Sequence, residues 1–558
     1  MAGAGIESGK AWSRIGAEVA PTGSAAPGVW GDLNEVAENI GAGNWPGPPI
    51  GFILLWGDPD ATAGVSAECY PYSMSLNGTA LTINTRYHGS ASQSGRIASG
   101  IIALTGDPTE APTTVTGQAS WNWAITGTWT DNPYTEGWNS VVVDSSGNRY
   151  TTGALWGGAT YDYYNFGVVK MDSSQAVDWN VAFYDNATTT GTGLGNRGGV
   201  LKTVTSGYVV AFTDVYQVLY FTNKQRMQFL HLNDSTGAVT NAAQYYGLLD
   251  DYSAAALDGP PKVSNVVGDT FAFGVNASGS HSGYATSSIQ LVTVGSSSFT
   301  FNSWSSGATN LWNYSTGNSA IYVNSVTQDS SNNVYAIFTF AATNIDGAGL
   351  ANNLAIAKWD SSGTNQWVYC LRQQAGGVED SLQGGGIEID GTDLYISGSS
   401  NTIGGTYSAP LIARIDVSGT PSLTWITQIS NPDWNVYAQN LKRIGSDQVI
   451  SLGYGQTNDP TGNAVVGVIP SLNIDGTTLG AAVVDDATWS VIDLSPYIVF
   501  ATAAAGGTAN VEVKQGSNTD LSWNTDTDVG AGTVSTWIHD TPATAGLGTI
   551  LVESGAIG

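Results

Sequence analysis

The chain has 558 residues, of which 45 are acidic and 17 are basic, and its formal net charge is −28. A nucleic-acid interface needs clustered Lys and Arg to neutralise phosphates, and the sequence contains no such cluster. The same charge argues against an anionic membrane surface or an acidic polymer as the main ligand. Hydrophobic residues make up 42% of the chain, including 19 Trp and 25 Tyr, which excludes a mainly disordered protein.

The N-terminal region shows no export or membrane signal. Residues 1–14 lack a basic segment followed by an apolar one, so no signal peptide is predicted. The most apolar stretch, Ile50–Trp56, is far too short to cross a bilayer. We therefore expect a protein that is made in the cytoplasm and does not insert into a membrane.

Residues 1–50 are predicted to contain a short helix. Asp32 is suited to cap its N-terminus, Glu35 stands at the capping-box spacing, and Pro46 ends it. The segment resembles one found in tail and appendage proteins of bacteriophages, which runs Gly-Val-Trp, Leu-x-Glu, a helical stretch and Gly-x-Trp-Pro. The matching residues are Gly28, Val29, Trp30, Leu33, Glu35, Gly43, Trp45 and Pro46. Two residues separate Trp30 from Leu33, where the phage pattern has one.

This resemblance implies that residues 1–50 anchor the chain to another protein of a virion. The residues expected to carry the contact are Trp30, Leu33, Trp45 and Pro46. The alternative is an ordinary helix that is packed by its two tryptophans.

Residues 51–135 are expected to form a small β-domain. The segment Thr79–Thr85 alternates apolar and polar residues, as a half-buried strand does. A group of three tryptophans follows between positions 121 and 129. No long amphipathic helix is predicted in this region.

Residues 136–485 contain a repeat. Asn139–Tyr150 and Asn324–Tyr335 each read as a strand, a polar turn of Asp, Ser, Gly or Asn, and a second strand that begins with Tyr. A second element follows each of them, in which a basic residue precedes a turn and a Trp opens the next strand. These basic residues and tryptophans are Lys170 and Trp179, Lys358 and Trp367, and, in a looser copy, Arg414 and Trp425.

Weaker copies extend the repeat to six units, which start near residues 139, 201, 262, 324, 383 and 440. Four strands in each unit and no helical periodicity are typical of a β-propeller. The units resemble the bacterial β-propeller repeat family, with its pattern Asp-x-x-Gly-Asn-x-Tyr and Lys-x-Asp-x-x-Gly followed by Trp. Asn332 replaces the turn glycine in one unit, and Gln175 replaces the second glycine in another. We predict an all-β chain with six four-stranded blades, or seven if the flanking segments supply one.

Residues 486–558 contain apolar runs such as Tyr497–Phe500 and Thr549–Val552, separated by loops of Gly, Ala and Thr. Runs of this kind predict short strands. The region is therefore expected to be a second small β-domain, or an array of strands that depends on a partner.

The sequence predicts no catalytic residue, cofactor site or metal site. Gly193–Gly198 spells Gly-x-Gly-x-x-Gly, but no strand and helix surround it. Asp526 and Asp528 precede Gly530 at the wrong spacing for a calcium loop, which favours a solvated acidic turn. The four histidines are His88, His231, His281 and His539, which are scattered singly, and the two cysteines are Cys69 and Cys370, which form no metal or disulfide pattern. A carboxylate pair for glycoside hydrolysis cannot be chosen among the 45 acidic residues.

Three functions remain open. The first is a structural virion protein without enzymatic activity, a homo-oligomeric tail fibre or appendage component that attaches to a host-surface glycan or protein. The second is a propeller that binds or degrades polysaccharide. The third is a secreted or cell-surface bacterial adhesion propeller. The phage-like segment and the missing signal peptide favour the first.

Overall fold

The structure of the chain is a computed structural model. It describes residues 13–15, 28–31, 53–57, 68–77, 80–88, 96–103, 113–126, 138–156, 164–173, 177–185, 192–194, 198–219, 222–246, 256–257, 262–278, 287–301, 309–313, 321–340, 353–373, 382–401, 408–430, 434–444, 448–457, 465–473, 481–484, 487–503, 507–509, 512–514, 523–526, 538–540 and 548–554. These residues form strands and one 3-10 turn, Ser495–Tyr497, and they include no α-helix. None of the described residues belongs to a helix that could span a membrane.

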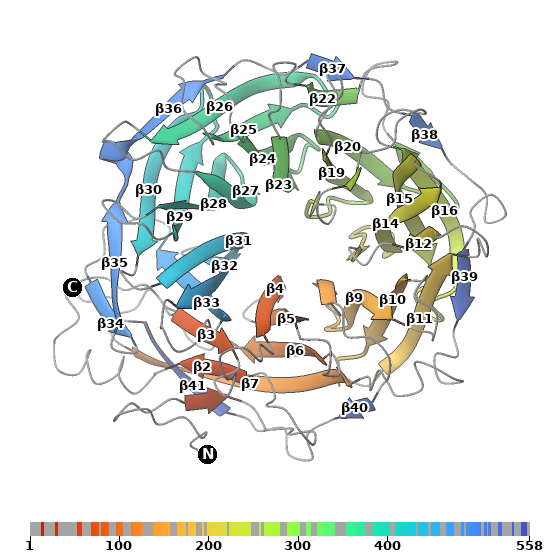
Figure 1. The fold of residues 1–558 in the computed structure, drawn as a ribbon, viewed down its shortest axis with the longest axis horizontal. Coiled ribbons are helices and arrows are strands. Elements are labelled where there is room, and N and C mark those ends of the chain that lie inside the picture. The colour runs from red at the N-terminus through yellow and green to blue at the C-terminus, as the bar shows by residue number, and fades with distance from the viewer. Residues whose placement is uncertain are drawn as a thin grey trace.

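The described strands form seven antiparallel sheets, which stand around a common axis like the blades of a propeller (Figure 1). We number the sheets in the order in which they follow one another around the ring. The predicted all-β architecture is confirmed, and the predicted unit starts near residues 139 to 440 fall in or next to the first strands of sheets 2 to 7.

The first three sheets lie in the first half of the chain. Sheet 1 consists of β4 (Glu68–Asn77), β5 (Ala80–His88), β6 (Arg96–Ala103) and β7 (Thr113–Thr126). Sheet 2 consists of β8 (Trp138–Val143), β9 (Arg149–Trp156), β10 (Tyr164–Met171) and β11 (Val177–Asp185). Sheet 3 consists of β12 (Thr192–Leu194), β13 (Gly199–Lys202), β14 (Val209–Leu219), β15 (Thr222–Leu232) and β16 (Val239–Tyr246).

The next three sheets follow in chain order. Sheet 4 consists of β17 (Ala256–Leu257), β18 (Lys262–Val263), β19 (Thr270–Ser278), β20 (Ser287–Val294), β21 (Phe299–Phe301) and β22 (Thr309–Asn313). Sheet 5 consists of β23 (Ile321–Gln328), β24 (Val334–Phe340), β25 (Asn353–Trp359) and β26 (Asn365–Gln373). Sheet 6 consists of β27 (Gln383–Asp390), β28 (Asp393–Asn401), β29 (Ser408–Asp416) and β30 (Ser422–Ser430).

Sheet 7 combines strands from the two ends of the chain. Its first three strands are β31 (Trp434–Ile444), β32 (Gln448–Thr457) and β33 (Val465–Asn473). The fourth is β3 (Ile53–Gly57), which pairs with β33, and β2 (Gly28–Gly31) and β1 (Ser13–Ile15) continue the sheet outward. The strands of 51–135, expected to form a separate domain, therefore complete sheet 7 and supply sheet 1. Pairing between distant segments leaves no local signal in the sequence.

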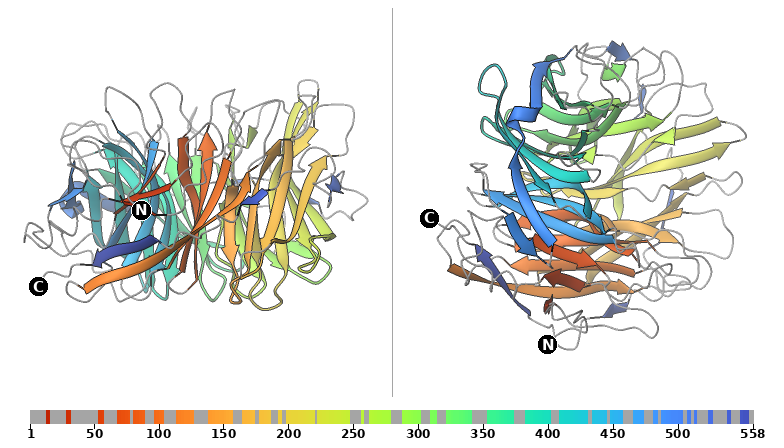
Figure 2. Two further views of the ribbon diagram at one scale, coloured as in Figure 1. Left: turned by 90° about the horizontal axis from the view of Figure 1, so that it is seen from below. Right: turned by 60° about the vertical axis from the view of Figure 1, so that its left-hand side comes forward.

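The C-terminal strands also differ from the expected separate β-domain. They form no sheet of their own, and they add to the outer edges of six sheets in reverse chain order (Figures 1 and 2). We call them the C-terminal belt. The belt consists of β34 (Ala481–Val484) and β35 (Ala487–Asp493) on sheet 6, β36 (Ile498–Thr502) on sheet 5, β37 (Gly507–Ala509) on sheet 4, β38 (Glu512–Lys514) on sheet 3, β39 (Trp523–Asp526) on sheet 2, and β40 (Ile538–Asp540) and β41 (Gly548–Ser554) on sheet 1.

Where side chains of the belt and its flanking residues are described, they pack against the sheets in addition to pairing through the backbone. The ring of Phe500 stacks on that of Tyr369 in sheet 5, with centroids 4.7 Å apart. Leu494 and Ile498 are buried in the same hydrophobic cluster. The amide of Ala503 donates a hydrogen bond to the carbonyl of Val368 at 3.0 Å. The outer edges of sheets 5 and 6 are therefore covered by apolar contacts and not by backbone pairing alone.

The repeated turns are held by their own aspartates. Asp144 Oδ1 accepts hydrogen bonds from the amides of Ser146 and Asn148, and Asp329 makes the matching bonds in sheet 5. The fourth turn position takes a positive φ, which Gly147 adopts at 81° and Asn332 at 61°. Asn is among the few non-glycine residues that tolerate this conformation, which explains how it replaces the glycine.

Candidate functional site

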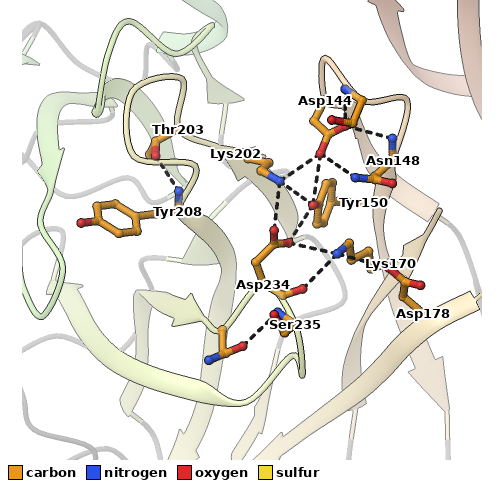
Figure 3. Close-up of polar contacts among 12 residues, drawn as sticks. Asp144, Asn148, Tyr150, Lys170, Asp178, Lys202, Thr203, Tyr208, Asp234 and Ser235 are labelled. Atoms are coloured by element: carbon orange, nitrogen blue, oxygen red, sulfur yellow. Dashed lines mark hydrogen bonds and ion pairs between the residues drawn. The ribbon is translucent and has the colours of Figure 1, made fainter. Parts of the chain in front are cut away.

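The largest described cluster of charged side chains lies between sheets 2 and 3, and its members come from both sheets (Figure 3). We call it the inter-sheet network. Its residues are Asp144, Asn148, Tyr150, Lys170, Asp178 and Trp179 from sheet 2, and Lys202 and Asp234 from sheet 3.

Lys202 is the centre of the network. Its Nζ lies 2.9 Å from Asp144 Oδ2, 3.2 Å from Asp234 Oδ2 and 2.6 Å from the hydroxyl of Tyr150. The ammonium also lies over the Tyr150 ring, 4.8 Å from its centroid. The side chains of Lys202 and Asp144 are only 15% and 11% exposed, so this ion pair is largely shielded from water.

The turn that contains Asp234 joins β15 to β16 and receives two further donors from sheet 2. Lys170 Nζ lies 3.1 Å and Trp179 Nε1 lies 2.8 Å from the main-chain oxygen of Asp234. Lys170 also pairs with Asp178 at 3.2 Å. The hydroxyl of Tyr150 in β9 also donates to Asp234 Oδ1, so this turn of sheet 3 is bound by three strands of sheet 2.

The network fixes the protonation of its members. Burial alone would raise the pKa of Asp144, but hydrogen bonds from Lys202 and Asn148 outweigh it and hold that pKa below its usual value. The pKa of Asp234 is lowered in the same way, against burial, by Tyr150 and Lys202. Burial and the hydrogen bond to Asp234 raise the pKa of Tyr150, whose hydroxyl lies 2.7 Å from Asp234 Oδ1.

The protonation of these groups argues against two catalytic roles, a general acid and a tyrosine base. A general acid must be protonated at the working pH, but both carboxylates are held ionised. A tyrosine that acts as a base needs a lowered pKa, and that of Tyr150 is raised. The network therefore joins two sheets, and neither Asp144 nor Asp234 is held in the protonated form that a general acid needs.

The same three strand positions recur in two other sheets. Tyr150, Lys170 and Trp179 are cross-strand neighbours in sheet 2. The equivalent residues are Tyr335, Lys358 and Trp367 in sheet 5, and Tyr395, Arg414 and Trp425 in sheet 6. In sheets 2 and 5, the residues marked by the repeat contact the next sheet.

The equivalent indole of sheet 6 differs from that of sheet 2 in its hydrogen bonding. Trp425 is 8% exposed, and its Nε1 is buried without a hydrogen-bond partner, whereas Trp179 Nε1 has Asp234 O. Sheet 7 takes its fourth strand, β3, from the N-terminus, so no turn links β33 to a fourth strand.

The residues predicted to anchor the chain are mostly outside the described part. Trp30 lies in β2, so the segment begins as a strand between β1 and β3. Leu33, Trp45, Pro46 and the expected helix fall outside the described residues. The anchoring role stays a prediction.

The histidine, cysteine and aspartate residues considered in the sequence lie in different sheets. His231 and Cys370 are buried in β15 and β26, and Asp526 lies in β39. Within the described residues, no group of three or more His, Cys, Asp or Glu is arranged to hold a metal ion. Sequence reasoning missed Lys202 and Asp234 as network members, because a motif within one unit does not reveal which residues of the next unit it meets.

The two ends of the sheets differ. The turns at one end, which we call the turn end, are tight and hydrogen-bonded within themselves, as in 144–148, 329–333 and 360–364. At the opposite end, strands are joined by longer segments outside the described residues. We call it the connection end, and its segments include 157–163, 279–286, 341–352, 374–381 and 402–407.

No protein-family profile and no curated protein matches the chain. Among solved structures, it is similar to a mutant of the α-L-arabinofuranosidase Arb93A of Fusarium graminearum bound to an iminosugar inhibitor, with 12% identity and a TM-score of 0.36 over 59% of this chain and 91% of that one. An ulvan lyase matches with 9% identity and a TM-score of 0.38 over 73% and 94%. The Dos1 propeller matches with 7% identity and a TM-score of 0.36 over 72% and 95%. These values are too low to assign a function.

Proposed function

We propose that the protein is a polysaccharide-binding propeller that meets its ligand at the connection end. The observation that carries this proposal is the difference between the two ends. At the turn end, the described aspartates Asp144, Asp234 and Asp329 are engaged in Asp-capped turns or in the inter-sheet network. Ligand recognition needs polar and aromatic groups that are not already used in this way.

The sequence of the connection-end segments suits a sugar polymer. Tyr161 and Tyr163 occur in one segment, and Tyr284 and Tyr407 in two others. Aromatic rings supply large, stiff contact surfaces, and carboxylates accept hydrogen bonds from hydroxyl groups. The net charge of −28 disfavours a polyanion, so we propose an uncharged polysaccharide.

Binding to a panel of neutral and acidic polysaccharides tests this function, with retardation in affinity gels as the readout. We expect neutral polymers to retard the protein. The double substitution Tyr161→Ala, Tyr163→Ala should weaken binding by about tenfold, which corresponds to about 1.4 kcal/mol. Tyr497→Ala is the matched control, because Tyr497 is an exposed tyrosine (41%) next to the belt. Equal effects of both variants, or retardation by acidic polymers alone, would contradict the proposal.

Polysaccharide cleavage is a separate outcome of the same assay. New reducing ends or unsaturated products would show that the protein degrades its ligand. Asp144 and Asp234 both bind Lys202 and have lowered pKa values, so they do not form the acid–base pair of a glycoside hydrolase. A degrading activity would therefore depend on other carboxylates.

The second candidate is a virion appendage, and the phage-like segment Gly28–Pro46 favours it. In this role the polysaccharide would belong to the host surface. Antibodies against residues 136–485 are expected to label the tails or projecting fibres of purified phage particles from the same source. Unlabelled intact particles would remove this candidate and leave polysaccharide binding untouched.

A further inference from the structure

His231 lies in the space between sheets 3 and 4. It is 5% exposed, and it belongs to β15, the third strand of sheet 3. Its ring meets the Tyr208 ring edge-on, with centroids 4.8 Å apart, and that of Phe299 in sheet 4 at 6.3 Å. Phe229 and Phe299 extend the same aromatic packing. The imidazole is therefore part of an apolar junction.

The register shows that His231 takes the place of a permanent cation. It pairs with Val210 on one side and Asn241 on the other. The same position holds Lys170 in sheet 2, Lys358 in sheet 5 and Arg414 in sheet 6. Lys170 and Arg414 each have a carboxylate partner, at 3.2 Å and 2.7 Å.

The surroundings of His231 disfavour the protonated, positively charged imidazole. Its Nδ1 is buried without a hydrogen-bond partner. Burial lowers the pKa of His231, and no charged neighbour offsets it. Tyr208 is the titratable group beside it in its own sheet, and the described strands and turns of sheet 4 carry Lys262 and Asp269. The carboxylate of Asp269 already accepts the amide and hydroxyl of Ser206, at 2.9 and 2.6 Å.

We propose that His231 makes the junction between sheets 3 and 4 acid-sensitive. In the closed junction the imidazole is neutral, and its protonation would place an unpaired cation among aromatic rings. Opening of the junction returns the ring to water, where its pKa is about 6.5. The open form thus binds the proton more readily, so the junction is fully stable above pH 6.5 and loses stability as the pH falls below it.

Hydrogen exchange detected by mass spectrometry tests this at pH 7.5 and 5.5, after correction for the intrinsic exchange rate. One proton is coupled to opening, so one pH unit below 6.5 increases the open population up to about tenfold. We expect this increase in peptides that contain β15, β19 and β21, and not in peptides from the junction between sheets 5 and 6. An imidazole NMR titration should give a pKa below 6.5 in the intact protein.

Two variants separate a switch from simple packing. His231→Phe keeps an aromatic ring and cannot take up a proton, so the pH dependence should disappear. Asn241→Asp places a carboxylate opposite His231, which should restore protection at pH 5.5. The proposal is overturned if the wild type exchanges equally at both pH values, or if His231→Phe retains the increase. If His231→Phe does not fold, an Asn241→Asp protein that remains acid-sensitive overturns it as well.

Discussion

Replacing Lys202 with Met is expected to lower the free energy of unfolding by about 3 kcal/mol, because removing one partner of a buried ion pair leaves the other uncompensated. The substitution leaves Asp144 and Asp234 ionised around the Tyr150 hydroxyl. Both carboxylates have lowered pKa values, so their contribution is present above about pH 3.8 and is lost as the pH falls through their folded values. The deficit should therefore shrink in strong acid.

Urea unfolding at pH 7 and pH 3 measures both effects. Lys358→Met is the matched control. Lys358 Nζ lies over the Tyr335 ring, 5.1 Å from its centroid, where cation–π attraction contributes about 1 kcal/mol or less. Equal losses in the two variants would show that the carboxylates add nothing to the cohesion of sheets 2 and 3.

Ending the chain at Asp486 is expected to have the largest effect of all. This truncation removes the belt from β35 onward and uncovers the apolar contacts made by Leu494, Ile498 and Phe500. Each buried apolar side chain contributes about 1.5–3 kcal/mol, so the loss from these residues alone is about 5 kcal/mol. The outer strands of six sheets also become unpaired edges, which favour aggregation.

A second truncation that ends at Ala503 separates packing from edge protection. It keeps β35 and β36, so the unfolding midpoint of sheets 5 and 6 should stay close to that of the full chain. It still exposes the edges of sheets 1 to 4, so light scattering should show self-association. If the shorter chain unfolds at the same urea concentration as the full chain and stays monodisperse, the belt is not a stabilising element.

The sequence repeat predicted the local structure well, because its signals are local. Asp144 and Asp329 with their turn residues, and the aligned Tyr, Lys and Trp of the strands, were recognisable from spacing alone. Their partners were not, because Lys202 and Asp234 come from a unit with weak identity to the others. Whether Trp30 and its neighbours anchor the chain is a prediction that the described residues do not test.

The sequence was least informative about the ends of the chain. In the sequence, β3 is an isolated apolar run. Its partner β33 follows it by about 400 residues, although the two strands are neighbours in sheet 7. The belt strands β37, β38 and β40 are too short to show an alternating pattern. The first region was therefore expected to be a separate domain, and the second a separate domain or a strand array that depends on a partner. The strands of both complete or border the sheets of the ring.

Because β3 pairs with β33, sheet 7 can be completed only after most of the chain has been synthesised. β3 leaves the ribosome early, yet its partner Val465–Asn473 is among the last strands of the ring to be made. Pairing over such a separation is slow, and the nascent chain must keep its sheet edges from associating with other chains in the meantime. The belt follows immediately and first reaches sheet 6, then each earlier sheet in turn. The belt therefore covers sheet 6 first, and the edge of sheet 1 is covered only after β40 and β41 have been made.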